Sequence, residues 1–456
     1  MLEINRILQI IGFTTAQAFL SALASMFFGF LGAQGLWSVS KSKSARGVLS
    51  GFALLPNTLP IIFVIFSFLK YLPLARGFLG IVLAHCFLNS GLVAIAIYQL
   101  LQSKIGALAE IAWIEGCGRI RFIFKVALPY LKNDLLRTMF FVFAISFTSF
   151  AVPLMIGGSQ GTSLEVLIYE KIRVTNEWSE AFVLVFAEIV FIMAISFFIR
   201  RQVAPQTTSV SKSPLLSSNF GIFILVTPAI FILFCLAQSF KGHLRLWPSL
   251  DSTESSGEIL SLTLGSYFVA IGSGLMTLIF LFLAARFRPT PIFRRFYLGL
   301  ASPSAVFVGF LLIWLNQSTG WATICKLIFG LTIMHLPILY RLSWDSQIFA
   351  VSSQIETGQI LGASRARIFS KLVAPQILRG AYNLAGLAAL WAFSDFTLAS
   401  IVAEKNVSLA QYFSHLTESY RWEQAESLML PMIFGSILCY FIFSGVGYVT
   451  SRSALR

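Results

Sequence analysis

Two carboxylates stand inside long apolar stretches of the chain: Glu188 in LVFAEIVFI and Asp395 in WAFSDFTLA. A charged side chain at the centre of a bilayer costs about 2.5–3.5 kcal/mol on insertion scales, so each residue is a functional candidate. A carboxylate beside an aromatic face, such as that of Trp391, would attract a cationic substrate. The structural alternatives are that Asp395 bonds Ser394 or a facing helix, and that Glu188 faces the bundle interior or is protonated.

A second set of polar side chains lies on apolar segments. His85 and Asn89 are one helical turn apart and are expected to share a helix face. Asn89 also takes the same position as His335 in the internal repeat described below. This pairing suggests polar groups near the interface of two halves, with ordinary hydrogen bonding between helices as the alternative.

The sequence offers no pattern for catalysis, metal binding or nucleotide binding. The four histidines are dispersed, and the five cysteines are scattered without a CxxC pair or an HExxH motif. No glycine is followed by lysine, so a phosphate-binding GxxxxGK[ST] loop is excluded. We therefore expect no enzyme activity, no metal site and no cofactor bound by this chain.

The composition indicates a membrane protein. Of the 456 residues, 57% are hydrophobic and 11% are charged, whereas soluble domains are about 25% charged. Because lipid-facing segments must satisfy their own backbone hydrogen bonds, the apolar runs are expected to be helices. Eleven such spans are predicted, near 8–35, 50–69, 78–101, 135–157, 180–199, 219–239, 259–285, 296–316, 321–340, 380–403 and 425–449.

The formal net charge of +14 is distributed unevenly between alternate loops. In a soluble protein this excess would suggest nucleic acid as a partner. Here one set of loops holds more than twice as many Lys and Arg residues as the other set. The positive-inside rule places the richer set in the cytoplasm, with the N-terminus outside and the C-terminus inside.

Two loops of the richer set are copies of each other. The segment EIAWIEGCGRIRFIFKVALPYL begins at Glu110, and ETGQILGASRARIFSKLVAPQI begins at Glu356, 246 residues later. In this register Gly116 meets Gly362, Arg119 meets Arg365 and Pro129 meets Pro375. The register continues into the following apolar span, so the duplication is parallel rather than inverted.

The repeated loop has a mechanical interpretation. Its glycine permits a sharp bend between two short helices, and its proline suits the start of the next membrane helix. The segment between them is amphipathic, which is typical of a short helix that enters a groove on a partner. The alternative is a helix lying on anionic lipid, but lipid binding does not require the Gly–Pro spacing that both copies keep.

The repeat divides the chain into two halves. Residues 1–200 form a first half of about five spans with its loop at 104–133, and residues 219–456 form a second half of about six spans with its loop at 347–379. The segment 201–218, RQVAPQTTSVSKSPLLSS, is polar and predicts a flexible cytoplasmic linker.

The pattern E-x-A-x-x-x-G…L-P in these loops resembles the "EAA" signature of inner-membrane permeases of bacterial binding-protein-dependent ABC importers. The fold that this resemblance implies is an all-α polytopic membrane protein with two type I permease halves in parallel repeat. Two copies in one chain are similar to the fused permeases of the iron(III) and thiamine type. Stretches such as Gln17–Leu23, Gly80–Asn89 and Ser394–Glu404 look closest to thiamine or thiamine pyrophosphate permeases.

The resemblance implies that each loop is a coupling helix that docks on an ATPase subunit. The coupling residues carried over are Glu110, Ala112, Glu115, Gly116, Arg119 and Pro129 in the first loop, and Glu356, Gly362, Ala363, Ser364, Arg365 and Pro375 in the second. The second loop departs from the signature, because Gly358 replaces Ala112 and Leu361 replaces Glu115.

The resemblance also implies partners: two copies of a cytoplasmic ABC ATPase that uses ATP, a periplasmic substrate-binding protein and membrane lipid, with no nucleic acid. The function it implies is ATP-driven import of thiamine or thiamine pyrophosphate across the bacterial inner membrane. The alternative substrates are iron(III) or another small solute. A secondary transporter or channel using Glu188 and Asp395 would leave the paired loops unexplained, and a membrane enzyme lacks any supporting motif.

Overall fold

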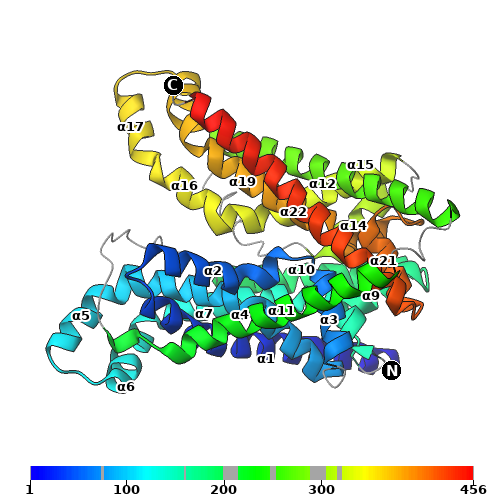
Figure 1. Cartoon of the computed structure of the whole chain (residues 1–456), viewed down its shortest axis with the longest axis horizontal. Coiled ribbons are helices and arrows are strands. Elements are labelled where there is room, and N and C mark those ends of the chain that lie inside the picture. The colour runs from blue at the N-terminus through cyan, green and yellow to red at the C-terminus, as the bar shows by residue number, and fades with distance from the viewer. Residues whose placement is uncertain are drawn as a thin grey trace. The chain divides into compact units, whose positions relative to one another are not determined.

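The computed structural model describes residues 2–72, 76–158, 161–198, 214–246, 253–287, 304–315 and 321–454. Within these ranges every regular element is a helix, and no strand is present. This confirms the predicted all-α class (Figure 1). Most of the expected linker and the first part of the expected span 296–316 lie outside the described residues.

Six helices in the described part are long and apolar enough to cross a membrane: Asn5–Ser38, Gly77–Ile114, Asn219–Lys241, Gly257–Phe287, Trp321–Leu339 and Trp422–Arg452. A seventh candidate is a pair, Lys43–Thr58 and Ile61–Tyr71, bent by 86°. The pair breaks between Leu59 and Pro60, and Pro60 donates no backbone hydrogen bond to the preceding turn. The remaining predicted spans, near 135–157, 180–199, 296–316 and 380–403, are not among these candidates.

Two predicted spans are each divided into two helices. Residues 135–157 fall on α7 (Leu128–Phe147) and α8 (Ala151–Ile156), and residues 380–403 fall on α19 (Ala374–Phe393) and α20 (Thr397–Val402). The apolar composition continues through both breaks, which is why hydropathy alone predicted unbroken spans. Local side-chain capping at Asp395 ends the continuity in the second case.

The structure forms two compact units. The first comprises Met1–Lys171 and Glu177–Ala237, and the second comprises Ile172–Asn176 and Gln238–Arg456. Helix α11 (Asn219–Leu246) therefore belongs largely to the first unit, although it follows the linker. Gly35 and Gly221 explain this packing, because a Cβ on either residue would collide with the backbone of the other.

The first unit is built around α1 (Leu2–Ser38), which packs against α4 (Gly77–Leu100) and α7. The Gln17 side-chain amide donates a hydrogen bond of 3.0 Å to the Ser146 carbonyl and so ties α1 to the end of α7. Besides α11, the unit also contains α2 (Lys43–Thr58), α3 (Ile61–Tyr71), α5 (Gly106–Ile114), α6 (Arg119–Phe122), α8, most of α9 (Leu164–Arg173) and α10 (Trp178–Phe198).

The second unit repeats this plan with α12 (Thr253–Phe287), α15 (Trp321–Leu339) and α19 in the corresponding positions. Its other helices are α14 (Ala305–Leu315), α16 (Asp345–Ala350), α17 (Ser352–Ile360), α18 (Arg365–Ile368), α21 (Leu409–Glu418) and α22 (Trp422–Ala454). A core cluster that includes Leu331, Leu398 and Val308 joins α15, α20 and α14. The helices α17, α18, α19 and α20 begin and end 246 residues after α5, α6, α7 and α8.

Candidate functional site

The loop between α5 and α6 makes its bend at Gly116, whose φ is +71°. The Gly116 amide donates to the Trp113 carbonyl at 3.0 Å, and the Cys117 amide donates to the Ala112 carbonyl at 2.9 Å. These bonds complete the end of α5 in the pattern that a left-handed glycine after a helix allows. The bend predicted from the glycine is therefore confirmed.

The loop between α17 and α18 has the same geometry. Gly362 has a φ of +75°, and the Ala363 amide donates to the Gly358 carbonyl at 3.0 Å. The Ser364 hydroxyl accepts a bond from the Arg367 amide and caps α18, whereas the corresponding Gly118 has no side chain to do so. The two loops thus share a backbone path although their side chains differ.

The tips of both loops expose large apolar side chains. Ile114 is 79% exposed in the first loop, and Ile360 and Leu361 are 85% and 79% exposed in the second. Each short helix is anchored on its other face, because Phe122 and Ile368 are buried. Exposed apolar groups of this size that are held rigidly by a buried anchor are typical of a protein-binding surface.

The two prolines lie at the start of the next long helix, as predicted. A π-helical turn, Ile123–Ala127, runs directly into α7, and Phe369–Val373 runs directly into α19. Pro129 and Pro375 occupy the first turns of these helices. The missing proline N–H is tolerated there because the wider turn has already displaced the normal hydrogen-bond pattern. A π-helical turn thus leads into each of these long helices.

The other residues predicted for coupling surround these bends. Glu115, Glu356, Ser364 and Arg365 are exposed, and Glu110, Ala112 and Ala363 are half-buried. All of them belong to, or directly flank, the four short helices α5, α6, α17 and α18. The structure therefore gathers each predicted set into one compact surface per unit.

Arg119 connects the first loop to the membrane helix α1. Its guanidinium Nη2 donates a hydrogen bond of 2.7 Å to the Gln34 side-chain oxygen. Arg365, at the same repeat position, makes no such bond within the described residues. Sequence reasoning missed Gln34, because a single glutamine near the end of an apolar run carries no distinguishing pattern.

The end of the linker is also part of the first unit. The short turn Pro214–Leu216 packs against α1, α5 and α6, and Leu216 is fully buried. The Ser218 amide donates to the Ser38 hydroxyl at 2.9 Å and to the Gln34 carbonyl at 3.3 Å. The described part of the linker, residues 214–218, is thus packed rather than flexible.

The candidate substrate-path residues of the second unit lie close together. The rings of His335 and Trp391 are 5.5 Å apart. Asp395 is half-buried, and its carboxylate accepts bonds from the Thr397 hydroxyl at 2.7 Å and the Leu398 amide at 2.9 Å. Asp395 therefore caps α20, which gives the carboxylate a structural role in addition to any role in transport.

The candidates of the first unit lie on different helices. Asn89 is buried on α4, one turn from His85, whose ring lies 3.5 Å from the Ser21 hydroxyl. Glu188 is buried on α10 beside Glu165 of α9. Glu165 was not predicted, because its surroundings in LEVLIYE resemble an amphipathic surface helix. In the described part of the chain no group of three or more His, Cys, Asp or Glu side chains is placed to hold a metal.

Comparison with known proteins gives a family and several relatives. The family model described as "Binding-protein-dependent transport system inner membrane component" matches residues 25–209 and 281–455. The thiamine transport system permease protein ThiP of Haemophilus influenzae is 26% identical over 291 residues, which cover 57% of this chain and 54% of that protein. The ThiP protein of Brucella suis is 24% identical over 364 residues, which cover 73% of this chain and 61% of that protein.

A relative with a different printed substrate matches a shorter stretch. The sulfoquinovosyl glycerol transport system permease protein SmoG of Agrobacterium fabrum is 33% identical over 92 residues, which cover 20% of this chain and 30% of that protein. The chain thus spans about half the length of the ThiP relatives that it matches. No solved structure matches this chain.

Proposed function

Since this chain belongs to the family of binding-protein-dependent transport system inner membrane components, we propose that it is the permease subunit of an ATP-driven importer. The chain is a multi-pass inner-membrane protein and not an enzyme. The observation that carries the proposal is the pair of loops bent at Gly116 and Gly362, because each presents an exposed apolar tip on a rigid base.

In this proposal each loop docks on one ATPase subunit, so two ATPase domains serve one chain. The exposed tips, Ile114 in the first unit and Ile360 with Leu361 in the second, enter grooves on these subunits. Closure of the ATPases then moves the two membrane halves, to which α7 and α19 transmit the displacement. The loops lie in the cytoplasm, which places the N-terminus outside and the C-terminus inside.

We propose thiamine or thiamine pyrophosphate as the substrate, delivered by a periplasmic binding protein. Two relatives that match long stretches of the chain are named for thiamine transport. Thiamine carries a cationic ring, and His335, Trp391 and Asp395 supply aromatic faces and a carboxylate in one unit. Asn89 and Glu188 are the corresponding polar candidates in the first unit.

The test is uptake by a thiamine-auxotrophic bacterial strain that lacks its own thiamine permease. The strain receives this chain together with its cognate ATPase and binding protein, and labelled thiamine is added at low concentration. We expect energy-dependent uptake that unlabelled thiamine pyrophosphate inhibits and ferric citrate does not. Uptake of labelled iron with no uptake of thiamine would replace the proposed substrate, and thiamine uptake that survives inactivation of the ATPase would refute the coupling.

A further inference from the structure

The second unit contains an open hollow behind its loop. The hollow has a volume of about 270 Å³ and lies between the end of α12 and the elements α17, α18 and Phe369–Val373. Its floor is apolar, with Ile355, Ile368 and Val373 all buried. Ile368 of α18 lines the hollow, whereas Ile360 and Leu361 at the exposed loop tip do not.

The equivalent place in the first unit is filled. There the turn Pro214–Leu216 packs against α1, α5 and α6, which correspond to α12, α17 and α18. Leu215 and Leu216 are buried in that position. The chain supplies this apolar plug to the first unit, and in the described part of the second unit no equivalent plug lines the hollow.

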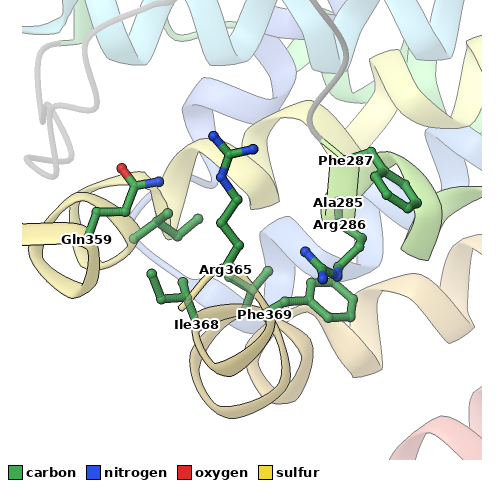
Figure 2. A pocket seen from close by; sticks show the side chains of 9 residues that line it. Ala285, Arg286, Phe287, Gln359, Arg365, Ile368 and Phe369 are labelled. Atoms are coloured by element: carbon green, nitrogen blue, oxygen red, sulfur yellow. The ribbon is translucent and has the colours of Figure 1, made fainter. Parts of the chain in front are cut away.

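Two arginines from different elements line the open hollow. Arg286 lies in the last turn of α12, and its guanidinium lies 5.8 Å from the centres of the Phe287 and Phe369 rings. Arg365 begins α18. Figure 2 shows Arg365 and Gln359 on one side of the hollow, and Arg286, Phe287 and Phe369 on the other. Neither guanidinium forms an ion pair with a carboxylate within the described residues.

We propose that this hollow binds the headgroup region of an anionic glycerophospholipid. The positive charge of its two guanidiniums suits a phosphate, and its apolar floor suits the glycerol and the first carbons of an acyl chain. The hollow lies at the end of a membrane-crossing helix, where lipid headgroups are available. The lipid would do for the second loop what the Leu215–Leu216 plug does for the first, by supporting the short helix from behind.

A protein segment is a poorer occupant. The volume of about 270 Å³ lies below the range typical of sites that enclose drug-sized ligands, so it holds a headgroup rather than a folded element. The exposed apolar tip, not the hollow, presents the surface expected for the ATPase. Binding of lipid therefore goes beyond the proposed transport function and is measurable in the absence of the ATPase.

The test uses the full chain in nanodiscs of equimolar phosphatidylcholine and phosphatidylglycerol. Native mass spectrometry then counts the lipids that remain bound after gentle removal of the bilayer. We expect the Arg286→Gln/Arg365→Gln variant to retain at least threefold less phosphatidylglycerol than the unmodified chain. The matched control, Arg379→Gln/Arg452→Gln, removes the same charge from arginines that lie over the Tyr448 ring, and it should retain phosphatidylglycerol normally.

A second variant, Ala285→Phe, fills the hollow without changing its charge and should also lose the lipid. Its insertion and folding are checked by size-exclusion chromatography. The proposal is overturned if the hollow variants and the control variant retain phosphatidylglycerol equally well. It is also overturned if all of them lose phosphatidylglycerol equally, since that would indicate general electrostatic attraction. Displacement of the lipid by millimolar inorganic phosphate would assign the site to free phosphate. If a hollow variant loses binding of the ATPase but retains phosphatidylglycerol, the hollow is a contact site for the ATPase.

Discussion

Arg119 on the short helix α6 donates a hydrogen bond of 2.7 Å to Gln34 on the long helix α1, 85 residues earlier in the chain. The same glutamine accepts, through its backbone carbonyl, bonds from Ser38 and Ser218. Gln34 therefore joins the first loop, a membrane-crossing helix and the end of the linker at one point. In the second unit no equivalent bond holds Arg365 within the described residues.

Under the proposed function, removal of the Gln34 side chain should weaken the link between the docked ATPase and the membrane helices. We expect Gln34→Ala to reduce thiamine uptake several-fold while ATPase binding changes little, because the exposed loop tip is untouched. The energy of one charge-assisted hydrogen bond, about 1.5–3 kcal/mol, sets the scale of the effect. The measurement compares uptake with co-purification of the ATPase.

The control for this prediction is Gln34→Glu, which keeps an oxygen acceptor for Arg119 and should restore most of the uptake. Loss of co-purification in Gln34→Ala would show that the residue supports docking rather than transmission. Equal uptake in both variants and in the unmodified protein would mean that the hydrogen bond has no part in coupling.

The left-handed glycines of the two loops should not tolerate a branched side chain. A β-branched residue at positive φ is a conformational outlier, so Gly116→Val or Gly362→Val should displace the loop tip. We expect each variant to insert normally but to lose most of its co-purification with the ATPase. These variants test backbone strain without a steric clash, because a Cβ at either position meets no other atom within 4 Å.

Gly118 provides the matched control for these variants. It lies two residues after Gly116, its φ is −70°, and a Cβ there also meets nothing within 4 Å. Gly118→Val should therefore retain ATPase binding. If Gly116→Val and Gly118→Val bind the ATPase equally well, the bend is not the docking determinant.

Asp134 stabilises the first unit through two cations. Its carboxylate lies 2.8 Å from the Lys104 ammonium and 3.2 Å from the Arg137 guanidinium, and all three side chains are mostly buried. Asp134→Asn removes the negative charge from both ion pairs, so we expect a loss of about 1–3 kcal/mol in stability. A thermal shift assay in detergent measures the lower unfolding midpoint.

The second unit supplies the comparison for Asp134. Gly380 occupies the corresponding repeat position, and Gln347 fills the space beside it. A double variant, Asp134→Asn with Lys104→Met, removes one of the two positive charges that Asp134 offsets and should recover part of the stability. No recovery would mean that the pair with Arg137, and not that with Lys104, carries the effect.

Substitution of Asp395 distinguishes its structural role as the cap of α20 from its proposed role in binding the substrate. Asp395→Asn keeps an oxygen for the Leu398 amide but loses the acceptor for the Thr397 hydroxyl, at a cost of about 1 kcal/mol. If the carboxylate meets the cationic substrate, the concentration for half-maximal uptake should also rise at least several-fold. The measurement is the concentration dependence of labelled thiamine uptake.

Thr397→Val is the control for Asp395, because it breaks the same hydrogen bond and keeps the carboxylate. It should lower stability in the same way and leave the half-maximal concentration unchanged. Equal half-maximal concentrations in Asp395→Asn and Thr397→Val would restrict Asp395 to capping α20.

Tyr420 holds an unfavourable backbone conformation after α21. Its φ is +58° and its side chain is 82% exposed; Asn176, which like Tyr420 lies two residues before a helix that begins with Trp, takes a φ of +56°. Asparagine tolerates this region better than tyrosine, so Tyr420→Asn should raise stability by up to about 1 kcal/mol. Thermal unfolding tests this, and lost uptake with raised stability would identify Tyr420 as a functional contact.

The sequence alone determined the all-α membrane class, the parallel repeat and the places of the two bends. Composition decides the class because a bilayer accepts only backbone that bonds to itself, and glycine identifies a bend because only glycine adopts a positive φ without cost. The tertiary structure decided which side chains meet. The bond from Arg119 to Gln34 and the packing of Leu215 and Leu216 join groups that are far apart in the chain and whose sequence neighbours give no sign of the contact. Packing in three dimensions creates these contacts, and a local pattern cannot encode them because each depends on a partner that lies far away in the chain.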